Sequence, residues 1–347
     1  MDIAIYKSGF TALAISISCT PILIKISRKK GFFAAINHRS SHDASVPNTG
    51  GIILCFAVLI PLVLFSGYPK QEDFSLIISA FAVLLITGII DDFNPIPVTY
   101  KFLGQFIPAI VIVTSIEERG LVIPFLNDFV QLPYIFNYLF WIFFIVMSIN
   151  AFNLIDGIDG LAIGMGILGG LFYFFKFLNL GEINLTIFSI SLCLGLLGLF
   201  FYNISARYKI FIGDTGALLI GGLLMFFALK FIGLSDEVSN NSSFFLVLGS
   251  IFVPLVDMIR VTLVRIINRD SPFKADRQHI HHILLDLLHG HHFYTATILI
   301  ICQIGIIFLF QRIVQFANPP YLIIILIIFL IYFWISFKLK KLRNSSV

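Results

Sequence analysis

The stretch FIGDTGALLIGGLLMFFALKFI, residues 211–232, decides the fold class. A short polar segment around Asp214 is followed by an apolar run from Gly216 to Ile232 that only Lys230 interrupts. A run of about 17–25 apolar residues spans the hydrocarbon core of a bilayer, which is about 30 Å thick. Because backbone polar groups in lipid need partners within their own segment, this run is expected to be a transmembrane helix.

Similar apolar runs recur along the whole chain. Of the 347 residues 58% are hydrophobic and 12% charged, whereas soluble domains carry roughly 25% charged residues. This composition argues against a water-soluble protein with a very large core. We predict an all-α, polytopic integral membrane helical bundle that forms a single domain, residues 1–347. Hydropathy predicts about eleven spans, at 3–24, 50–66, 75–90, 101–116, 135–151, 160–178, 184–202, 216–232, 244–266, 295–312 and 320–338.

Most basic residues of the loops fall on one side of this topology, and the loops of the other side are poor in Lys and Arg. By the positive-inside rule the basic side is cytoplasmic, so the N-terminus is expected outside and the C-terminus inside. The net charge of +4 then reflects orientation and anionic lipid, and no nucleic-acid partner is expected. The cytoplasmic side carries Lys25, Arg28, Lys29, Lys30, Arg39, Arg207, Lys209, Arg265, Arg269, Lys274, Arg277, Lys338, Lys340, Lys341 and Arg343; the outer loops carry Glu72, Asp73, Glu117, Glu118, Asp236 and Glu237.

Asp91 and Asp92 close the third predicted span. Two adjacent carboxylates at a helix C-terminus repel one another and the negative end of the helix dipole. A metal cation or a cationic partner would offset this cost, and a solvated helix end is the plain alternative. Lys101 and Gln105 share one face of the next helix near the same aqueous mouth. Lys101 is expected to hold a phosphate, to neutralise the Asp pair, or only to anchor the helix.

The segment NAFNLIDGIDG, residues 150–160, joins the fifth and sixth spans and is the strongest chemical signal. A plain turn needs one Asx-Gly pair, whereas this segment holds two Asn, two Asp and two Gly. Amides suit a nucleobase or ribose, carboxylates accept hydrogen bonds from ribose hydroxyls or base N–H groups, and glycines let a backbone approach a ligand. The chemistry-bearing residues are Asn150, Asn153, Asp156, Gly157 and Asp159.

Asp214 lies between glycines near a helix N-terminus, a setting that suits a phosphate or a metal-bound phosphate. A capping Asp that merely opens a membrane helix is the alternative. Phe211 is placed to stack on a base. The segment Pro47 to Gly51 opens the second span, and its two glycines offer backbone N–H groups to an anion.

The last large cytoplasmic loop contains DRQHIHH, residues 276–282. Three histidines within four residues are compatible with zinc. The neighbouring Arg277 favours instead a clamp for pyrophosphate. A solvated polar loop is the third interpretation. His289, His291 and His292 follow without an assigned role.

Taken in order, these segments resemble the polyprenyl-phosphate N-acetylhexosamine-1-phosphate transferase superfamily, glycosyltransferase family 4. The resemblance runs from about Asn37 to His292 and rests on DD…K…Q, then NxxNxxDGxDGL, FxGDxG and a His-rich loop. The HIHH sequence after Arg277, and PLVDMIR at 254–260, resemble the branch that uses UDP-GlcNAc and undecaprenyl phosphate. The phospho-MurNAc-pentapeptide transferase branch is the alternative. One departure is Asn48, where the family usually carries a basic residue, so the resemblance gives no lipid-phosphate contact there.

The resemblance implies roles for individual residues. Asp214 would bind Mg²⁺, with Mn²⁺ as an alternative ion. Asp92 would serve as a second metal residue, and Asp91 as a candidate base. Asn153, Asp156, Gly157, Asp159 and Phe211 would form the uridine pocket, Asn150 and Lys101 would face phosphates, and Arg277, His279, His281 and His282 would hold the pyrophosphate or sugar.

The implied reaction transfers N-acetylhexosamine-1-phosphate, by default GlcNAc-1-phosphate, from a UDP-sugar to undecaprenyl phosphate. It releases UMP and is the first membrane step of cell-surface polysaccharide assembly, on the cytoplasmic face of a bacterial inner membrane. Loops near 25–49, 91–101, 150–160, 203–216 and 267–293 would carry the site, and homodimers occur in the family. A transporter with intramembrane acids is the rival class, but here the motif acids stand at span ends. A CDP-alcohol-type phosphotransferase would show a different Asp spacing.

Overall fold

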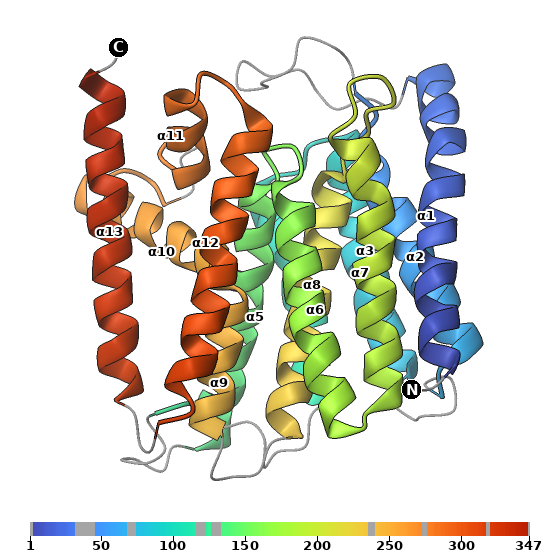
Figure 1. The fold of residues 1–347 in the computed structure, drawn as a ribbon, viewed down its shortest axis with the longest axis horizontal. Coiled ribbons are helices and arrows are strands. Elements are labelled where there is room, and N and C mark those ends of the chain that lie inside the picture. Colours follow the sequence, from blue (N-terminus) through green and yellow to red (C-terminus); the bar gives the residue numbers. More distant parts are fainter. Residues whose placement is uncertain are drawn as a thin grey trace.

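The computed structural model of the protein describes residues 3–31, 46–67, 74–115, 123–125, 133–234, 240–272, 276–316 and 320–345. The basic residues Arg39 and Lys274 and the six acids expected in the outer loops lie outside these residues. Within the described ranges the protein is all-helical, which confirms the predicted class (Figure 1). The helices are α1 (Ile3–Lys30), α2 (Gly50–Phe65), α3 (Phe74–Phe93), α4 (Val98–Thr114), α5 (Tyr134–Ile155), α6 (Leu161–Leu180), α7 (Ile183–Asn203), α8 (Gly213–Gly233), α9 (Asn240–Ser250), α10 (Phe252–Ile267), α11 (Ile280–Leu287), α12 (His292–Ile313) and α13 (Tyr321–Ser345).

Each predicted span coincides with helical structure. Among the described helices, eight are long and apolar enough to cross a membrane, and the bent pair α9–α10 makes a ninth if it is counted as one span. The shorter apolar helices α2 and α4 have 16 and 17 residues, so the number of eleven crossings stays a prediction. The chain termini lie at opposite ends of the bundle (Figure 1).

The ninth predicted span, 244–266, is not one straight helix. It consists of α9 and α10, which meet at an angle of 82°. Pro254 has no N–H to donate to the preceding turn, which favours a break at this point. Gln303 of α12 satisfies the interrupted backbone: its amide donates to the carbonyl of Gly249 (2.7 Å) and accepts from the N–H of Val253 (2.9 Å). The bend therefore costs no buried backbone hydrogen bond at these two groups.

A short helix, α11, occupies part of the segment that the sequence suggested was a loop. It begins at Ile280, directly after His279, and buries Ile280, Ile283 and Leu285. The His-rich motif is thereby fixed on a helix that packs beside α12 and α13.

Helix α8 is the centre of the bundle. Its apolar window is 89% buried, whereas that of the peripheral α13 is 6% buried. Glycines let neighbouring backbones approach α8 closely, as small residues do in membrane helix packing. A Cβ atom added at Gly88 of α3 or at Gly51 of α2 would overlap backbone atoms of the Thr215–Gly216 turn. The polar start of α8 is therefore held against both helices.

We expect Gly88→Ala to lower the free energy of unfolding by about 1–3 kcal/mol or more, because the added methyl group meets backbone that cannot rotate away. Thermal unfolding of the purified protein in detergent measures this. Gly305→Ala in α12 is the matched control, since nothing lies within 4 Å of the added Cβ. Equal midpoints for the two variants would contradict the close approach.

Candidate active site

The carboxylate of Asp92 caps the start of α8. Its Oδ1 accepts hydrogen bonds from the backbone N–H of Asp214 (2.8 Å) and from Asn48 Nδ2 (2.6 Å). Its Oδ2 accepts from the backbone N–H (3.0 Å) and the hydroxyl (2.5 Å) of Thr215. Four donors fill the roughly four lone-pair positions that an ionised carboxylate offers. In this structure Asp92 thus fixes the first turn of α8, and its role as a metal ligand stays a prediction.

The segment before α2 also joins this turn. The N–H groups of Gly50 and Gly51 donate to the carbonyls of Phe211 and Ile212, both at 2.9 Å. The expectation that these N–H groups are offered to an anion is therefore wrong, because the loop before α8 uses them. Asn48, in the same segment, donates to Asp92.

Lys101 of α4 lies between two carboxylates from other helices. Its Nζ is 2.5 Å from Asp91 Oδ2 and 3.0 Å from Asp214 Oδ1. Asp91 is 7% exposed and also accepts a hydrogen bond from the N–H of Ile96 (3.0 Å). Asn153 Nδ2 donates to the same Oδ1 of Asp214. Of the interpretations of Lys101, charge neutralisation is the one that this geometry shows.

Asn150 is turned toward α4 rather than toward this cluster. Its amide is hydrogen-bonded to that of Gln105, which is fully buried, and its Nδ2 donates to the carbonyl of Val146 (2.8 Å). These bonds join α5 to α4 one helical turn after Lys101, so the Asn150 side chain fixes α5 against α4. Its predicted contact with phosphate stays a prediction.

The loop between α5 and α6 presents two carboxylates with different surroundings. Asp159 Oδ2 is 2.5 Å from Lys209 Nζ, and His292 Nδ1 accepts from the Asp159 N–H (3.2 Å). Lys209 also lies 5.5 Å from the ring centroid of Phe211. Among the described residues none donates a hydrogen bond to the carboxylate of Asp156. Burial, together with the negative charges of Asp214, Asp92 and Asp159, raises the pKa of Asp156 well above its ordinary value.

Two parts of the chain lie against the Asp-Gly loop, residues 156–160: Asn203 and the histidine segment, residues 279–282. Gly160 has a φ of +77°, in the left-handed region that favours glycine, and its N–H donates to Asn203 Oδ1 (2.6 Å). Asn203 in turn donates to the carbonyl of Ile210 (3.0 Å). A Cβ atom at Gly157 would lie 3.7 Å from His282 and 3.9 Å from His281. The Asp-Gly loop and the histidine segment therefore face one another.

The three histidines differ in what they contact. His279 Nδ1 is 2.9 Å from Asp257 Oδ2, while Asp257 also pairs with Arg260 (2.7 Å). His281 is 0% exposed, and among the described residues neither of its ring nitrogens has a hydrogen-bond partner; within the same residues His282 Nδ1 and His279 Nε2 are also buried without one. Buried unpartnered polar atoms call for a ligand or water. Burial lowers the pKa of His281 well below its ordinary value and that of His282 to about 4.

Arg277 makes a protein contact in this structure. Its Nη2 is 2.6 Å from Oδ1 of Asp286, in the last turn of α11, and Arg343 of α13 donates to the Arg277 carbonyl (2.9 Å). The predicted contact of Arg277 with pyrophosphate stays a prediction.

The donor chemistry suits Mg²⁺ better than zinc. In the part of the chain that the structure describes, no three His, Cys, Asp or Glu side chains are placed together for one metal ion, so the protein alone forms there neither a three-ligand zinc site nor a site of three carboxylates. Mg²⁺ is commonly held by one or two carboxylates, with substrate phosphates and water completing the site. The carboxylates of Asp214 and Asp91 and the unpaired Asp156 provide hard oxygen donors around one mouth of the bundle.

Several residues of this arrangement could not be selected from the sequence. Five such residues each contact a predicted site residue or its loop: Thr215, Asn203, Lys209, Asp257 and His292. Only pairing across the bundle reveals them. A signal existed for Lys209, which stands two residues before the FIGDTG motif in a loop of few charges.

The fold and the site together define a multi-pass helical membrane protein with a cluster of acids, amides and histidines at one end of its bundle. The sequence model of the family described as "Glycosyl transferase family 4" matches residues 74–268, which is more than half of the chain. A relative from Bacillus subtilis is 31% identical over 317 residues, covering 90% of this chain and 86% of its own length. The chain belongs to glycosyl transferase family 4.

Three relatives are named as transferases of N-acetylglucosamine phosphate to a polyprenyl phosphate. The Bacillus subtilis protein is a probable undecaprenyl-phosphate N-acetylglucosaminyl 1-phosphate transferase. A Yersinia pestis undecaprenyl-phosphate alpha-N-acetylglucosaminyl 1-phosphate transferase is 30% identical over 75% of this chain and 71% of its own. A Mycobacterium leprae decaprenyl-phosphate N-acetylglucosaminephosphotransferase is 28% identical over 90% of this chain and 84% of its own.

We expect Asp92→Asn to lower the free energy of unfolding by about 1–2 kcal/mol. The amide NH₂ group of the new side chain would face hydrogen-bond donors of Asp214 or Thr215, so part of the cap at the start of α8 would be lost. Thermal unfolding in detergent measures this. Asp214→Asn is the control, since the Asp214 carboxylate accepts from side chains only and caps no helix. A larger loss in Asp214→Asn than in Asp92→Asn would contradict the capping role.

The low pKa of His282 makes stability depend on pH. The unfolded chain, with an ordinary His pKa near 6.5, binds more protons than the folded one between that pH and about 4. Stability is therefore fully present above about pH 6.5 and is lost as the pH falls toward 4. We expect His282→Gln to flatten the fall in unfolding temperature between pH 6.5 and 4.5, whereas the exposed His289→Asn leaves it unchanged. Identical pH profiles for wild type and His282→Gln would contradict this.

Proposed function

We propose that the protein transfers GlcNAc-1-phosphate from UDP-GlcNAc to undecaprenyl phosphate, releasing UMP and forming undecaprenyl-pyrophosphate-GlcNAc. One observation carries the proposal. Residues of α3, α4, α5 and α8 meet at one mouth of a membrane bundle, where Lys101 joins Asp91 and Asp214 and Asn153 contacts Asp214. The names of the relatives supply the sugar and the lipid.

The location of the cluster suits a lipid acceptor. Asp91 lies at the end of α3 and Asp214 in the first turn of α8, both at the boundary between an apolar span and a loop. A polyprenyl chain in the bilayer would bring its phosphate to this depth, while a nucleotide sugar would enter from water. Because the second pKa of a phosphate monoester is about 6, the acceptor is largely dianionic at neutral pH.

The reaction is an in-line phosphoryl transfer. An oxygen of the lipid phosphate forms a bond to the β-phosphorus, which carries the sugar. The bond between this phosphorus and the bridging oxygen breaks, and UMP leaves with that oxygen. Lys101 offsets negative charge at the mouth, and Asp91 orients the acceptor phosphate and accepts its residual proton. Asp92 acts as a positioning residue that holds Asp214 in place.

Asp214 would hold Mg²⁺, with Mn²⁺ as the alternative ion and Asp92 as the second metal residue; Asn153 lies beside Asp214. A bound divalent cation supplies an electrostatic offset for the charge of the pyrophosphate. The contact between Asn153 and Asp214 in this structure supports the pairing of the two side chains.

We assign the uridine to the Asp-Gly loop. Asp159 and Phe211 contact Lys209, Asp156 and Gly157 belong to the same loop as Asp159, and His281 and His282 face Gly157. His279, His281 and His282 with Arg277 would then contact the pyrophosphate or sugar. The buried nitrogens of His281 support this, because a sugar hydroxyl or phosphate would give them a partner.

The proposed topology has eleven crossings: the eight long helices, the bent α9–α10 pair, and the shorter α2 and α4. The N-terminus would lie outside and the C-terminus in the cytoplasm of a bacterial cell, with the site on the cytoplasmic face of the inner membrane. The basic ends of α1 and α13 support this orientation. The product would start a cell-surface polysaccharide such as O-antigen, and a homodimer is part of the proposal.

The test combines purified protein, UDP-GlcNAc, undecaprenyl phosphate and Mg²⁺ and measures UMP release. We expect turnover in the wild type and a loss of at least about a thousandfold in Asp214→Asn, because preorganised charge stabilisation contributes on this scale. Manganese binding followed by electron paramagnetic resonance should weaken in the same variant. Glu182→Gln, between α6 and α7 at the opposite end of the bundle, is the control. Retained turnover in Asp214→Asn would overturn the assignment.

A further inference from the structure

A groove of about 460 Å³ lies between α10 and α13, outside the acid cluster described above. None of Asp91, Lys101, Asn153 or Asp214 lines it. Its walls combine aliphatic and aromatic side chains with amides and three basic groups. The residues that matter for its chemistry are Arg260, Val264, Gln278, Phe337, Lys340 and Lys341.

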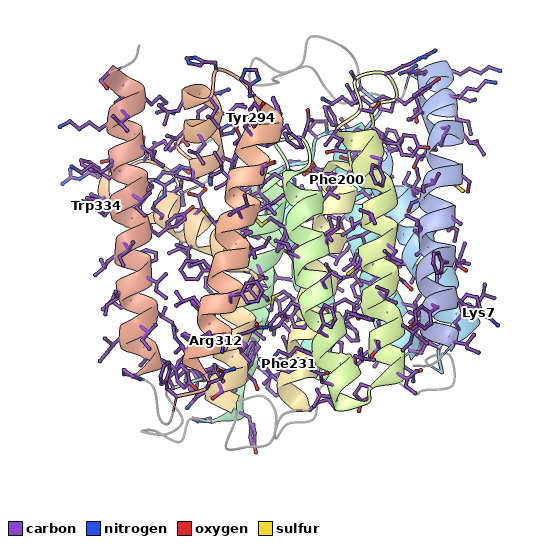
Figure 2. The ribbon with its side chains drawn as sticks, viewed as in Figure 1. Lys7, Phe200, Phe231, Tyr294, Arg312 and Trp334 are labelled. Carbon is purple, nitrogen blue, oxygen red and sulfur yellow. The ribbon has the colours of Figure 1, made fainter. Side chains whose placement is uncertain are left out.

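The mouth of the groove opens toward lipid. Ile267 of α10 is 75% exposed and Phe337 of α13 is 61% exposed, which in a membrane protein of this composition places both side chains against acyl chains. Trp334 lies on the outward side of α13 (Figure 2), and Lys338 Nζ is 5.6 Å from its ring centroid. A Trp followed by lysines marks the level where the hydrocarbon gives way to headgroups. The basic end of the groove is therefore at headgroup depth.

The charge of the groove is positive. No acidic residue is among its lining residues. Arg260 is paired with Asp257 at 2.7 Å, and Lys340 donates to the neutral amide oxygen of Gln278 at 3.2 Å. Among the described residues Lys341 has no anionic partner. Two lysine charges thus remain to be balanced beside an apolar wall. This combination is complementary to a lipid that has an anionic headgroup and acyl chains.

The groove also contacts the histidine segment. Arg260 Nη2 donates to the Gln278 carbonyl (2.7 Å), and Gln278 directly precedes His279. Lys340 holds the side chain of the same glutamine, and Arg343 holds the carbonyl of Arg277. The final turns of α13 are therefore attached to the loop that leads into α11.

We propose that this groove binds an anionic phospholipid, a phosphate diester such as phosphatidylglycerol, with its headgroup on Lys340 and Lys341 and its acyl chains along Phe337 and Val264. A bound lipid neutralises Lys340 and Lys341, and Lys340 is one of the two basic side chains that fasten the end of α13 to the histidine segment. The inference stands apart from the transferase activity, because it concerns a lipid that is not consumed.

The experiment measures lipid retention by native mass spectrometry, without nucleotide sugar. Protein released from detergent is titrated with phosphatidylglycerol or with phosphatidylcholine of the same acyl chains. We expect the wild type to retain phosphatidylglycerol at about tenfold lower concentration, and Lys340→Gln/Lys341→Gln to lose this preference, since each basic group near an anionic headgroup contributes measurably. Val264→Phe, which narrows the groove without changing charge, should weaken binding too.

The matched control is Lys29→Gln/Lys30→Gln, which removes two exposed lysines from the last turn of α1. Equal loss in the control would show charge attraction without a built site and overturn the proposal. Equal retention of both lipids by the wild type would do the same. A raised KM for undecaprenyl phosphate in Lys340→Gln/Lys341→Gln, with phosphatidylglycerol retention unchanged, would assign the groove to the acceptor and also overturn it. Lys341→Gln alone, an exposed change, keeps the test available if the double variant fails to fold.

Discussion

The hydrogen bonds on the carboxylate of Asp92 connect the parts on which the site depends. One side chain at the end of α3 receives two backbone N–H groups and a hydroxyl from the first turn of α8, and an amide from the segment before α2. Helix N-termini leave N–H groups without partners, and in this bundle the start of α8 is packed too tightly for water to supply them all. The cap therefore orients Asp214, and through Asp214 the position of Lys101 and Asn153.

Buried polar groups at two other places in the bundle are satisfied by side chains in the same way. Gln303 completes the backbone where α9 and α10 break, and the Gln105–Asn150 pair closes on itself between α4 and α5. Among the buried groups of the described residues that have no partner, ring nitrogens of His281 and His282 face the Asp-Gly loop around Gly157. The unsatisfied atoms thus mark the place where substrate would supply what the protein does not, while the satisfied ones mark its supports.

Sequence reasoning found the class of fold, the positions of the helices and the main chemical motifs, because span length and residue spacing are local properties. It did not find the bend at Ile251, since Pro254 within an apolar run is compatible with a continuous span and the compensating Gln303 lies about fifty residues away. It assigned the Gly50 and Gly51 N–H groups to an anion, because their partners at Phe211 and Ile212 come from a distant segment. Supports such as Asn203 and Asp257 need the tertiary structure for the same reason. The roles of Asp91, Asp156 and the histidines toward substrate stay predictions.

The most direct measurement of the central claim is a double-mutant cycle between Asp92 and Thr215, read as kcat/KM for UMP release. If Asp92 acts by holding the first turn of α8, Asp92→Asn and Thr215→Val remove the same hydrogen bond, so the double variant should lose much less than the sum of the two single losses, with a coupling of about 1 kcal/mol or more. Additive losses would contradict the account, because they would mean that Asp92 acts on the reaction independently of the helix that it caps.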